Sequence, residues 1–269
     1  NRNEALDLAK KYGDYALVID ADDTLDADAG FVWPELGAAG YMLEIVDVGG
    51  THYHRIAIPR LDVDWKWQGV LHEGLCMPTA APTPLLPGLR IRRTFHDGAR
   101  SRMGAREKFT RDAQVLRREL ETDPGNMRYR FYLAQSLRDA GDLPGAIAEY
   151  EKRAAMGGWE EEVYFSKLQI GALKERSNAP YADVVAAYLD ACDSRPIRAE
   201  APCELARYFR SHKRWHLARQ FAQIAASLPI PGDVLFIDRA VHDWRARDEL
   251  AIAAYWCGDH AQSAALCRE

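Results

Sequence analysis

The segment from Tyr15 to Leu25 is the feature that most constrains what this chain can fold into. A short apolar run over residues 15–19 ends in three carboxylates, Asp20, Asp22 and Asp23. A run of this length, rich in strand-forming residues, predicts a buried strand. Open α/β sheets bind ligands beyond the carboxyl ends of their strands, so we expect the carboxylates to face a ligand. The alternative is an acidic surface loop that merely follows a strand.

The three carboxylates also predict a cation site. Negative charges this close repel one another unless a positive charge lies among them. Carboxylate oxygens suit Mg²⁺ or Mn²⁺, and such ions are commonly held by one or two carboxylates together with substrate phosphates. We therefore expect Mn²⁺ or Mg²⁺ beside a phosphate-bearing ligand, with Asp22 as a ligand and Asp20 or Asp23 assisting it.

Length and charge narrow the class of protein. A chain of 269 residues is long enough for two domains, and its net charge of −5 argues against a nucleic-acid partner, which requires a basic face. We find no apolar stretch long enough for a membrane span and no signal peptide. The five cysteines are odd in number and lack Cys-x-x-Cys spacing, which favours free thiols in a reducing compartment. These features together predict a cytoplasmic protein.

The patterns of the first hundred residues mix helix and strand. Residues 3–11 predict a helix, and residues 40–47 and 52–61 alternate apolar and polar side chains around a Gly-Gly turn, which predicts a β-hairpin. The stretch 65–73 is too aromatic and too mixed for a plain strand. Residues 89–96 predict a last strand that ends at His96.

After Gly98 we predict helices and no further strand. Small residues at Ala134, Gly141 and Ala146 recur with a spacing that resembles a tetratricopeptide repeat, in which small side chains let antiparallel helices pack closely. The predicted fold class is therefore an α/β mixed sheet followed by an all-α helical-repeat domain, with an unspecialised helical bundle as the alternative. The expected boundaries are 1–99 for the sheet domain, 100–122 for a connecting helix and 123–269 for the repeats.

Two enzyme families place aspartates in this way. The segment resembles the Asp-x-Asp motif of family 2 glycosyltransferases of the GT-A fold, which follows a strand and holds a divalent ion against the donor diphosphate. It also resembles the first motif of haloacid-dehalogenase-type phosphotransferases, Asp-x-Asp-x-Thr-Leu, which residues 20–25 match letter for letter. In that family Asp20 would be the nucleophile and Asp22 an acid/base group.

The rest of the chain favours the glycosyltransferase resemblance. A dehalogenase-type enzyme needs a later acidic motif, and Gly232-Asp233 with Asp238 has nearly the right spacing but follows a proline-rich segment instead of a strand. Asn1-Arg2-Asn3 resembles the Ala-Arg-Asn segment of family 2 enzymes. Trp67-x-Gly-x-x-His72-Glu73 resembles a segment of a subgroup that is fused to helical repeats and includes peptide S-glycosyltransferases. By this resemblance the chain lacks the first nucleotide-binding units of a GT-A domain.

The resemblance implies roles for individual residues. The reaction would be an inverting transfer from a nucleotide-diphosphate sugar, with UDP favoured, to a peptide side chain or a glycan. The implied roles are donor binding by Arg2, Asp20 and Asp22, metal binding by Asp20, Asp22, Asp23 and His96, general-base catalysis by Glu73, and stacking of Trp65 and Trp67 on a sugar face. His72 would orient Glu73 or contact the sugar, and His96 would ligate the metal or meet the diphosphate directly. The two tryptophans are equally consistent with core positions. The helical repeats are expected to bind a partner protein or form a homodimer. A scaffold without catalytic activity is the non-enzymatic alternative.

Overall fold

The computed structural model describes residues 2–47, 50–93 and 104–268 of the chain. These residues form two compact units. The first comprises Asn1–Lys108 and Val234–Ile237, and the second comprises Phe109–Asp233 and Asp238–Glu269. The helix expected to connect two domains over residues 100–122 therefore falls largely within the helical unit.

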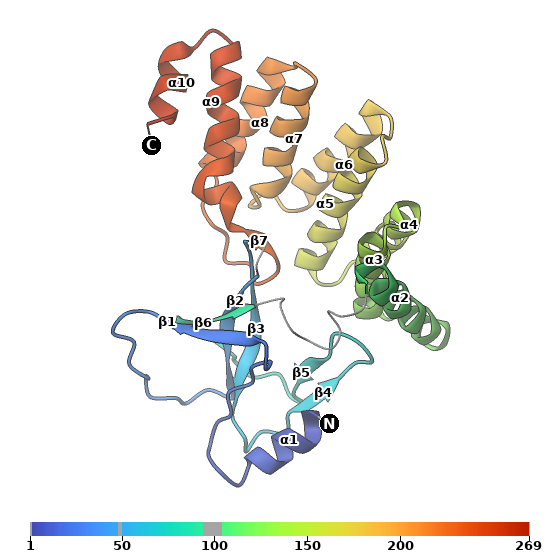
Figure 1. Ribbon diagram of the computed structural model, residues 1–269, viewed down its shortest axis with the longest axis vertical. Coiled ribbons are helices and arrows are strands. Elements are labelled where there is room, and N and C mark those ends of the chain that lie inside the picture. Colours follow the sequence, from blue (N-terminus) through green and yellow to red (C-terminus); the bar gives the residue numbers. More distant parts are fainter. Residues whose placement is uncertain (1, 48–49, 94–103, 269) are drawn as a thin grey trace. The chain divides into compact units, whose positions relative to one another are not determined.

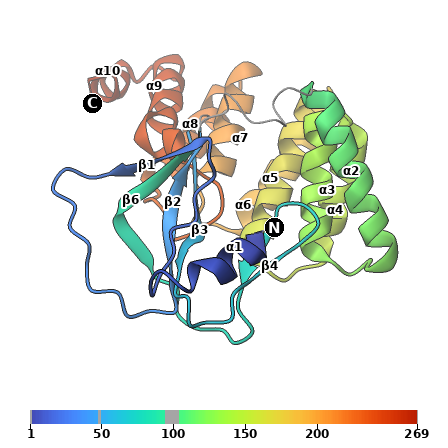
Figure 2. The same cartoon turned by 60° about the horizontal axis from the view of Figure 1, so that its bottom comes forward.

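The sheet unit contains a five-stranded mixed sheet with the strand order β1-β6-β2-β3-β7. β1 pairs antiparallel with β6, β2 pairs antiparallel with β3, and β2 runs parallel to β6 (Figure 2). A mixed sheet followed by helices confirms the predicted fold class. The sheet strands and the one helix before them are α1 (Arg2–Ala9), β1 (Asp23–Ala27), β2 (Gly40–Val46), β3 (Thr51–Pro59), β6 (Leu85–Arg93) and β7 (Ile237–Asp238).

Alternation along the strands gives the sheet two different faces. Leu43, Ile45 and Ile91 are fully buried in its core, and the register places Ile45 opposite Ile91. The intervening residues Glu44 and Arg90 point to the other face, where their side chains lie 3.8 Å apart as an ion pair. The predicted hairpin over 40–47 and 52–61 is confirmed, since this period-2 pattern buries one face and solvates the other.

The prediction of a buried strand at residues 15–19 is wrong, because this segment is neither a regular strand nor buried. The segment runs extended beside β3, with the Ala16 N–H donating to the Pro59 carbonyl (3.1 Å) and the Val18 N–H to the Ala57 carbonyl (2.8 Å). However, Leu17 is 41% exposed, and the regular strand begins only at Asp23. Asp20 and Asp22 thus precede a strand instead of ending one, because pairing along one edge does not bury both faces of an extended segment.

The prediction that no strand follows residue 98 is also wrong. Residues 234–237 belong to the sheet unit, where the His54 N–H donates to the Val234 carbonyl (2.8 Å). The ring of Phe236 meets that of Tyr53 edge to face at 5.5 Å. A strand of two residues is too short to show an alternating pattern, so sequence periodicity could not reveal it.

Antiparallel pairs of helices make up the second unit, where neighbours in the chain lie side by side (Figure 1). The pairs confirm the predicted tetratricopeptide-like repeats. None of the described helices is long and apolar enough to span a lipid bilayer. In chain order the helices are α2 (Ala105–Thr122), α3 (Met127–Ala140), α4 (Leu143–Ala155), α5 (Glu160–Arg176), α6 (Tyr181–Ser194), α7 (Glu200–Ser211), α8 (Trp215–Ser227), the π-helix η1 (Val241–Arg245), α9 (Ala246–Trp256) and α10 (His260–Leu266).

The turns inside these pairs share one backbone feature. Within residues 127–266, the turns of the pairs α3–α4, α5–α6, α7–α8 and α9–α10 each contain a residue with a left-handed φ. These residues are Gly141 (88°), Asn178 (55°), Lys213 (57°) and Gly258 (85°). A left-handed residue after a helix ends it and redirects the chain. The repeat is therefore clearer in the backbone than in the sequence, where only two of the four are glycine.

Buried arginines join the loops of the helical unit. The side chain of Asp233 is only 3% exposed and accepts hydrogen bonds from Arg195 Nε (2.7 Å) and Arg198 Nη1 (3.1 Å). Burial pushes the pKa of Asp233 upward, but the hydrogen bonds from the two arginines outweigh it and leave this pKa below its ordinary value. Asp238 likewise pairs with Arg245 (2.7 Å). The acidic residues that suggested a dehalogenase motif are thus engaged in ion pairs.

We expect Gly171→Ala to destabilise the helical unit by about 1–3 kcal/mol, because overpacking has this cost. A Cβ at Gly171 would lie 2.6 Å from Cδ1 of the buried Tyr188 ring. Urea unfolding followed by far-UV circular dichroism measures the change. Gly232→Ala is the matched control, since a Cβ there meets nothing within 4 Å. Equal stability of the two variants would contradict the close α5–α6 contact.

We expect Asp233→Asn to cost about 1–3 kcal/mol at pH 7, because Arg195 and Arg198 each lose a charged hydrogen-bond partner while retaining Glu160 and Glu200. The folded-state pKa of Asp233 is depressed, so its contribution is present above the unfolded pKa of about 3.9 and is lost as the pH falls through the folded value. The difference in unfolding free energy between wild type and variant should therefore shrink below about pH 4. A difference independent of pH would contradict the ionised network.

Candidate functional site

A short hairpin presents the predicted general base. Strands β4 (Lys66–Gln68) and β5 (Gly74–Cys76) pair antiparallel, and the loop between them carries His72 and Glu73. Gly69 has φ 120° and His72 has φ 51°, so the loop turns twice through the left-handed region. The mixed character of residues 65–73 reflects this loop between two very short strands.

The start of α1 holds the hairpin in place. The Asn3 Oδ1 atom accepts a hydrogen bond from the Trp67 N–H (2.7 Å), and Asn3 Nδ2 donates to the Trp67 carbonyl (3.2 Å). One amide side chain thus pairs with both backbone groups of a residue 64 positions away. Our sequence reasoning used the Arg-Asn segment only as a resemblance and assigned Asn3 no role.

Arg2 connects the hairpin with the acidic segment. Its Nη2 donates to Asp20 Oδ1 at 2.9 Å, and its Nε lies 3.6 Å from Glu73 Oε2. The guanidinium also lies over the Trp67 ring, 4.7 Å from its centroid. The structure therefore brings three residues singled out from the sequence, Asp20, Trp67 and Glu73, around the guanidinium of a fourth, Arg2.

Arg55 on β3 is a site residue that sequence reasoning missed. Its Nη1 lies 3.6 Å from Asp20 Oδ2, and its Nη2 lies 3.9 Å from Asp23 Oδ2. The Asp23 side chain is only 4% exposed, and burial raises its pKa, opposed by Arg93 and Arg55 and reinforced by Asp20. In the sequence Arg55 is one polar position of an alternating strand, so nothing marked it as functional.

The predicted metal ligands do not form a three-residue cluster. Among the described residues no three His, Cys, Asp or Glu side chains are placed to hold a metal ion, and His96 lies outside the described residues. Guanidinium groups provide the cations near Asp20 and Asp23 instead. One oxygen of this group has no hydrogen bond: Asp23 Oδ2 is buried and lies 3.9 Å from Arg55 Nη2.

The acceptor-stacking role expected of Trp65 is not supported. This side chain is 3% exposed and packs with Leu6, Leu61 and Leu75 in a core beneath the hairpin. A Cβ at Gly40 would lie only 2.9 Å from its ring. Trp67 is half-buried, with Arg2 over its ring, while His72 and Glu73 are exposed. Tryptophan is buried more often than not, and the spacing could not show which of the two lies inside.

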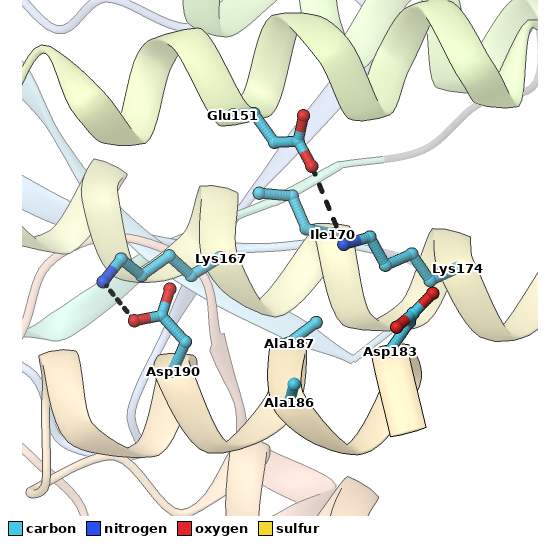
Figure 3. Close-up of a pocket in the computed structure, with 8 residues that line it drawn as sticks. All are labelled: Glu151, Lys167, Ile170, Lys174, Asp183, Ala186, Ala187 and Asp190. Carbon is cyan, nitrogen blue, oxygen red and sulfur yellow. Dashed lines mark hydrogen bonds and ion pairs between the residues drawn. The ribbon is translucent and has the colours of Figure 1, made fainter. Parts of the chain in front are cut away.

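Two hollows lie away from these residues. One of about 290 Å³ in the helical unit is crossed by the ion pairs Lys167–Asp190 (2.9 Å) and Lys174–Glu151 (3.7 Å), as Figure 3 shows. Another of about 520 Å³ in the sheet unit is lined by residues that include Lys10 and Arg60. Neither is lined by a residue predicted to belong to the site.

Comparisons with known proteins find likenesses only among solved structures. No family model and no curated protein matches the chain. MamA is 17% identical with a TM-score of 0.47, over 60% of this chain and 80% of that one. BtubC from P. vanneervenii is 15% identical with a TM-score of 0.45, over 64% of this chain and 89% of that one. TPR-like repeats of a Podosopora anserina kinesin light chain are 16% identical with a TM-score of 0.45, over 61% of this chain and 84% of that one. These likenesses carry no functional argument, and the repeat architecture rests on the helix pairs themselves.

We expect Asn3→Ala to accelerate hydrogen exchange at the Trp67 amide about fivefold, because this N–H loses its acceptor and a hydrogen bond is worth about 1 kcal/mol. Exchange followed by mass spectrometry of peptides that cover 66–76 measures the effect. Asn3→Asp is the matched control, since its carboxylate still accepts from that N–H. Unchanged exchange in the alanine variant would show that α1 does not hold the hairpin.

Proposed function

We propose that the sheet unit carries part of the active centre of a metal-dependent inverting glycosyltransferase. The donor is a nucleotide-diphosphate sugar, with UDP favoured, and the acceptor is a peptide side chain or a glycan. The observation that supports this most directly is the convergence on Arg2. Asp20 and Glu73, which are 53 positions apart, both lie within 4 Å of its guanidinium. Diphosphate-binding and proton-accepting groups are thus neighbours.

The donor side of the site would consist of Arg2 and the aspartates. A planar guanidinium suits the oxygens of a diphosphate, which it can contact through two N–H groups. In this proposal the diphosphate competes with Asp20 for Arg2. A Mn²⁺ or Mg²⁺ ion held by Asp20, Asp22 or Asp23 would stabilise the negative charge of the departing nucleoside diphosphate. Arg55 keeps Asp20 and Asp23 near each other despite their like charge.

The acceptor side would consist of the hairpin loop. The acceptor hydroxyl or thiol attacks the anomeric carbon, the bond from that carbon to the diphosphate oxygen breaks, and the configuration inverts. Glu73 takes the acceptor proton, a role that requires it within hydrogen-bond reach of the attacking atom. Its side chain is 40% exposed, so an acceptor can approach it. Adjacent His72 would orient the carboxylate, and the Trp67 ring would contact the acceptor.

Two other functions have weaker support. A phosphatase with Asp20 as nucleophile retains its match at residues 20–25, but Asp233 and Asp238 are engaged by arginines and Asp23 starts strand β1. The helical repeats favour a partner protein or a second copy of this chain as a ligand of that unit, since stacked helix pairs offer extended surfaces for binding. A scaffold role of this kind is compatible with the transferase and does not require it.

A panel of nucleotide sugars tested by thermal shift, with and without Mn²⁺, examines the proposal. A donor at about 100 times its Kd should raise the melting temperature by roughly 5–10 °C in the presence of Mn²⁺. Asp20→Asn should abolish the shift. Glu73→Gln should retain it but slow donor hydrolysis or transfer about 100-fold or more, because a general base contributes at least this much.

Asp62→Asn is the matched control, since Asp62 pairs with Arg60 (2.6 Å) outside the Arg2 cluster. It should retain both the shift and the turnover. Phosphate release from p-nitrophenyl phosphate that is lost in Asp20→Asn and retained in Glu73→Gln would instead establish the phosphatase. No metal-dependent shift with any nucleotide sugar would refute donor binding by this chain.

A further inference from the structure

An exposed aromatic surface occupies one edge of the helical unit. The rings of Trp215, at the start of α8, and Trp256, at the end of α9, stack at 4.9 Å with an angle of 12° between their planes. Tyr255 meets Trp256 edge to face at 5.6 Å. Trp256 is 57% exposed and Tyr255 is 53% exposed. Trp256 therefore keeps more than half of its surface exposed although it contacts both Trp215 and Tyr255.

Two cations and a histidine border these rings. Lys213 and Arg214 form the turn directly before Trp215, and His260 lies 4.9 Å from the ring of Tyr255. All three side chains are exposed, and Lys213 and Arg214 make no ion pair within the described residues 104–268. The nearby Asp259 is already engaged, by the Arg219 guanidinium (2.6 Å) and the Gln262 N–H (3.1 Å). We call these six residues, 213–215, 255–256 and 260, the tryptophan edge.

The charge of the edge is opposite to that of the chain as a whole, which carries a net charge of −5. Uncompensated cations beside exposed rings favour a ligand that has carboxylates and an apolar side chain together. A neutral glycan would use the rings and leave Lys213 and Arg214 without partners. A nucleic acid commonly needs several phosphate contacts, and this edge offers only two permanent cations.

We propose that the tryptophan edge binds an acidic peptide segment of a partner protein. Carboxylates of the peptide pair with Lys213 and Arg214, and one aromatic or aliphatic side chain packs on the exposed surface of Trp256. This site lies wholly in the helical unit and does not depend on the transferase chemistry proposed for the sheet unit.

A dye-labelled decapeptide of glutamates with two central tryptophans tests the proposal by fluorescence polarisation on the full chain. We expect a Kd of about 100 µM or tighter at low salt, weakening as salt is added. The same peptide with lysines in place of glutamates should bind at least about tenfold more weakly, because like charges repel at the edge.

Two variants locate the binding. Trp256→Ala and the double change Lys213→Glu with Arg214→Glu should each weaken binding about tenfold or more, as expected for a central aromatic and for reversed charge. Trp159→Ala removes another exposed tryptophan, 43% exposed, and Arg117→Glu with Arg118→Glu makes the same charge change on α2. These matched controls should bind within about twofold of wild type.

Trp256→Phe retains an aromatic ring and should retain most of the affinity, which separates a binding effect from misfolding of the alanine variant. No binding at 1 mM peptide, equal binding of the lysine peptide, or equal losses in the controls would each overturn the proposal. Tighter binding of a thymidine decamer or of maltohexaose at the same residues would overturn it in favour of a nucleic acid or a glycan.

Discussion

Charge compensation around Asp20 and Asp23 is the constraint on which the candidate site depends. Two carboxylates repel each other, and burying one of them adds a desolvation cost. Cations nearby must therefore compensate their charge. Arg2 on α1 pairs with Asp20, and Arg55 on β3 lies near both Asp20 and Asp23. Because Arg2 also lies 3.6 Å from Glu73, the same guanidinium links the acidic segment to the hairpin loop.

The hairpin itself would be a weak element without α1. Two paired strands of three residues each are marginal in water. Asn3 adds two hydrogen bonds to the Trp67 backbone, and Trp65 anchors the strand in a buried cluster with Leu6 of α1. Helix α1 therefore positions Glu73, the proposed general base, and also carries Arg2, the residue proposed to bind the diphosphate.

The helical unit uses buried ion pairs where a simple bundle would use apolar contacts. Arg153 is 1% exposed and donates twice to Glu162, which joins the end of α4 to the start of α5. Arg198 makes a bidentate pair with Glu200 and also reaches Asp233. Removing one partner of such a pair is far more costly than removing an exposed one.

Local periodicity was sufficient for the helices and the β2–β3 hairpin, because burial of one face leaves a pattern of period 3.6 or 2 in the residues themselves. It failed at residues 15–19 and at β7, where short segments share an edge of β3 and carry too few residues for a pattern. Sequence motifs marked Arg2, Asp20 and Glu73 as candidate site residues. They did not mark Arg55, whose partner Asp23 is 32 positions away, or Asn3, whose partner Trp67 is 64 positions away.

The sequence alone thus determined the helices and the β2–β3 hairpin, the mixed-sheet and helical-repeat classes, and the residue types of a candidate diphosphate site. Only the tertiary structure decided that Trp65 is core, that arginines neutralise the aspartates and that one guanidinium joins Asp20 to Glu73. The physical reason is range: hydrophobic periodicity acts between neighbours along the chain, whereas charge pairing and desolvation depend on groups that only folding brings together.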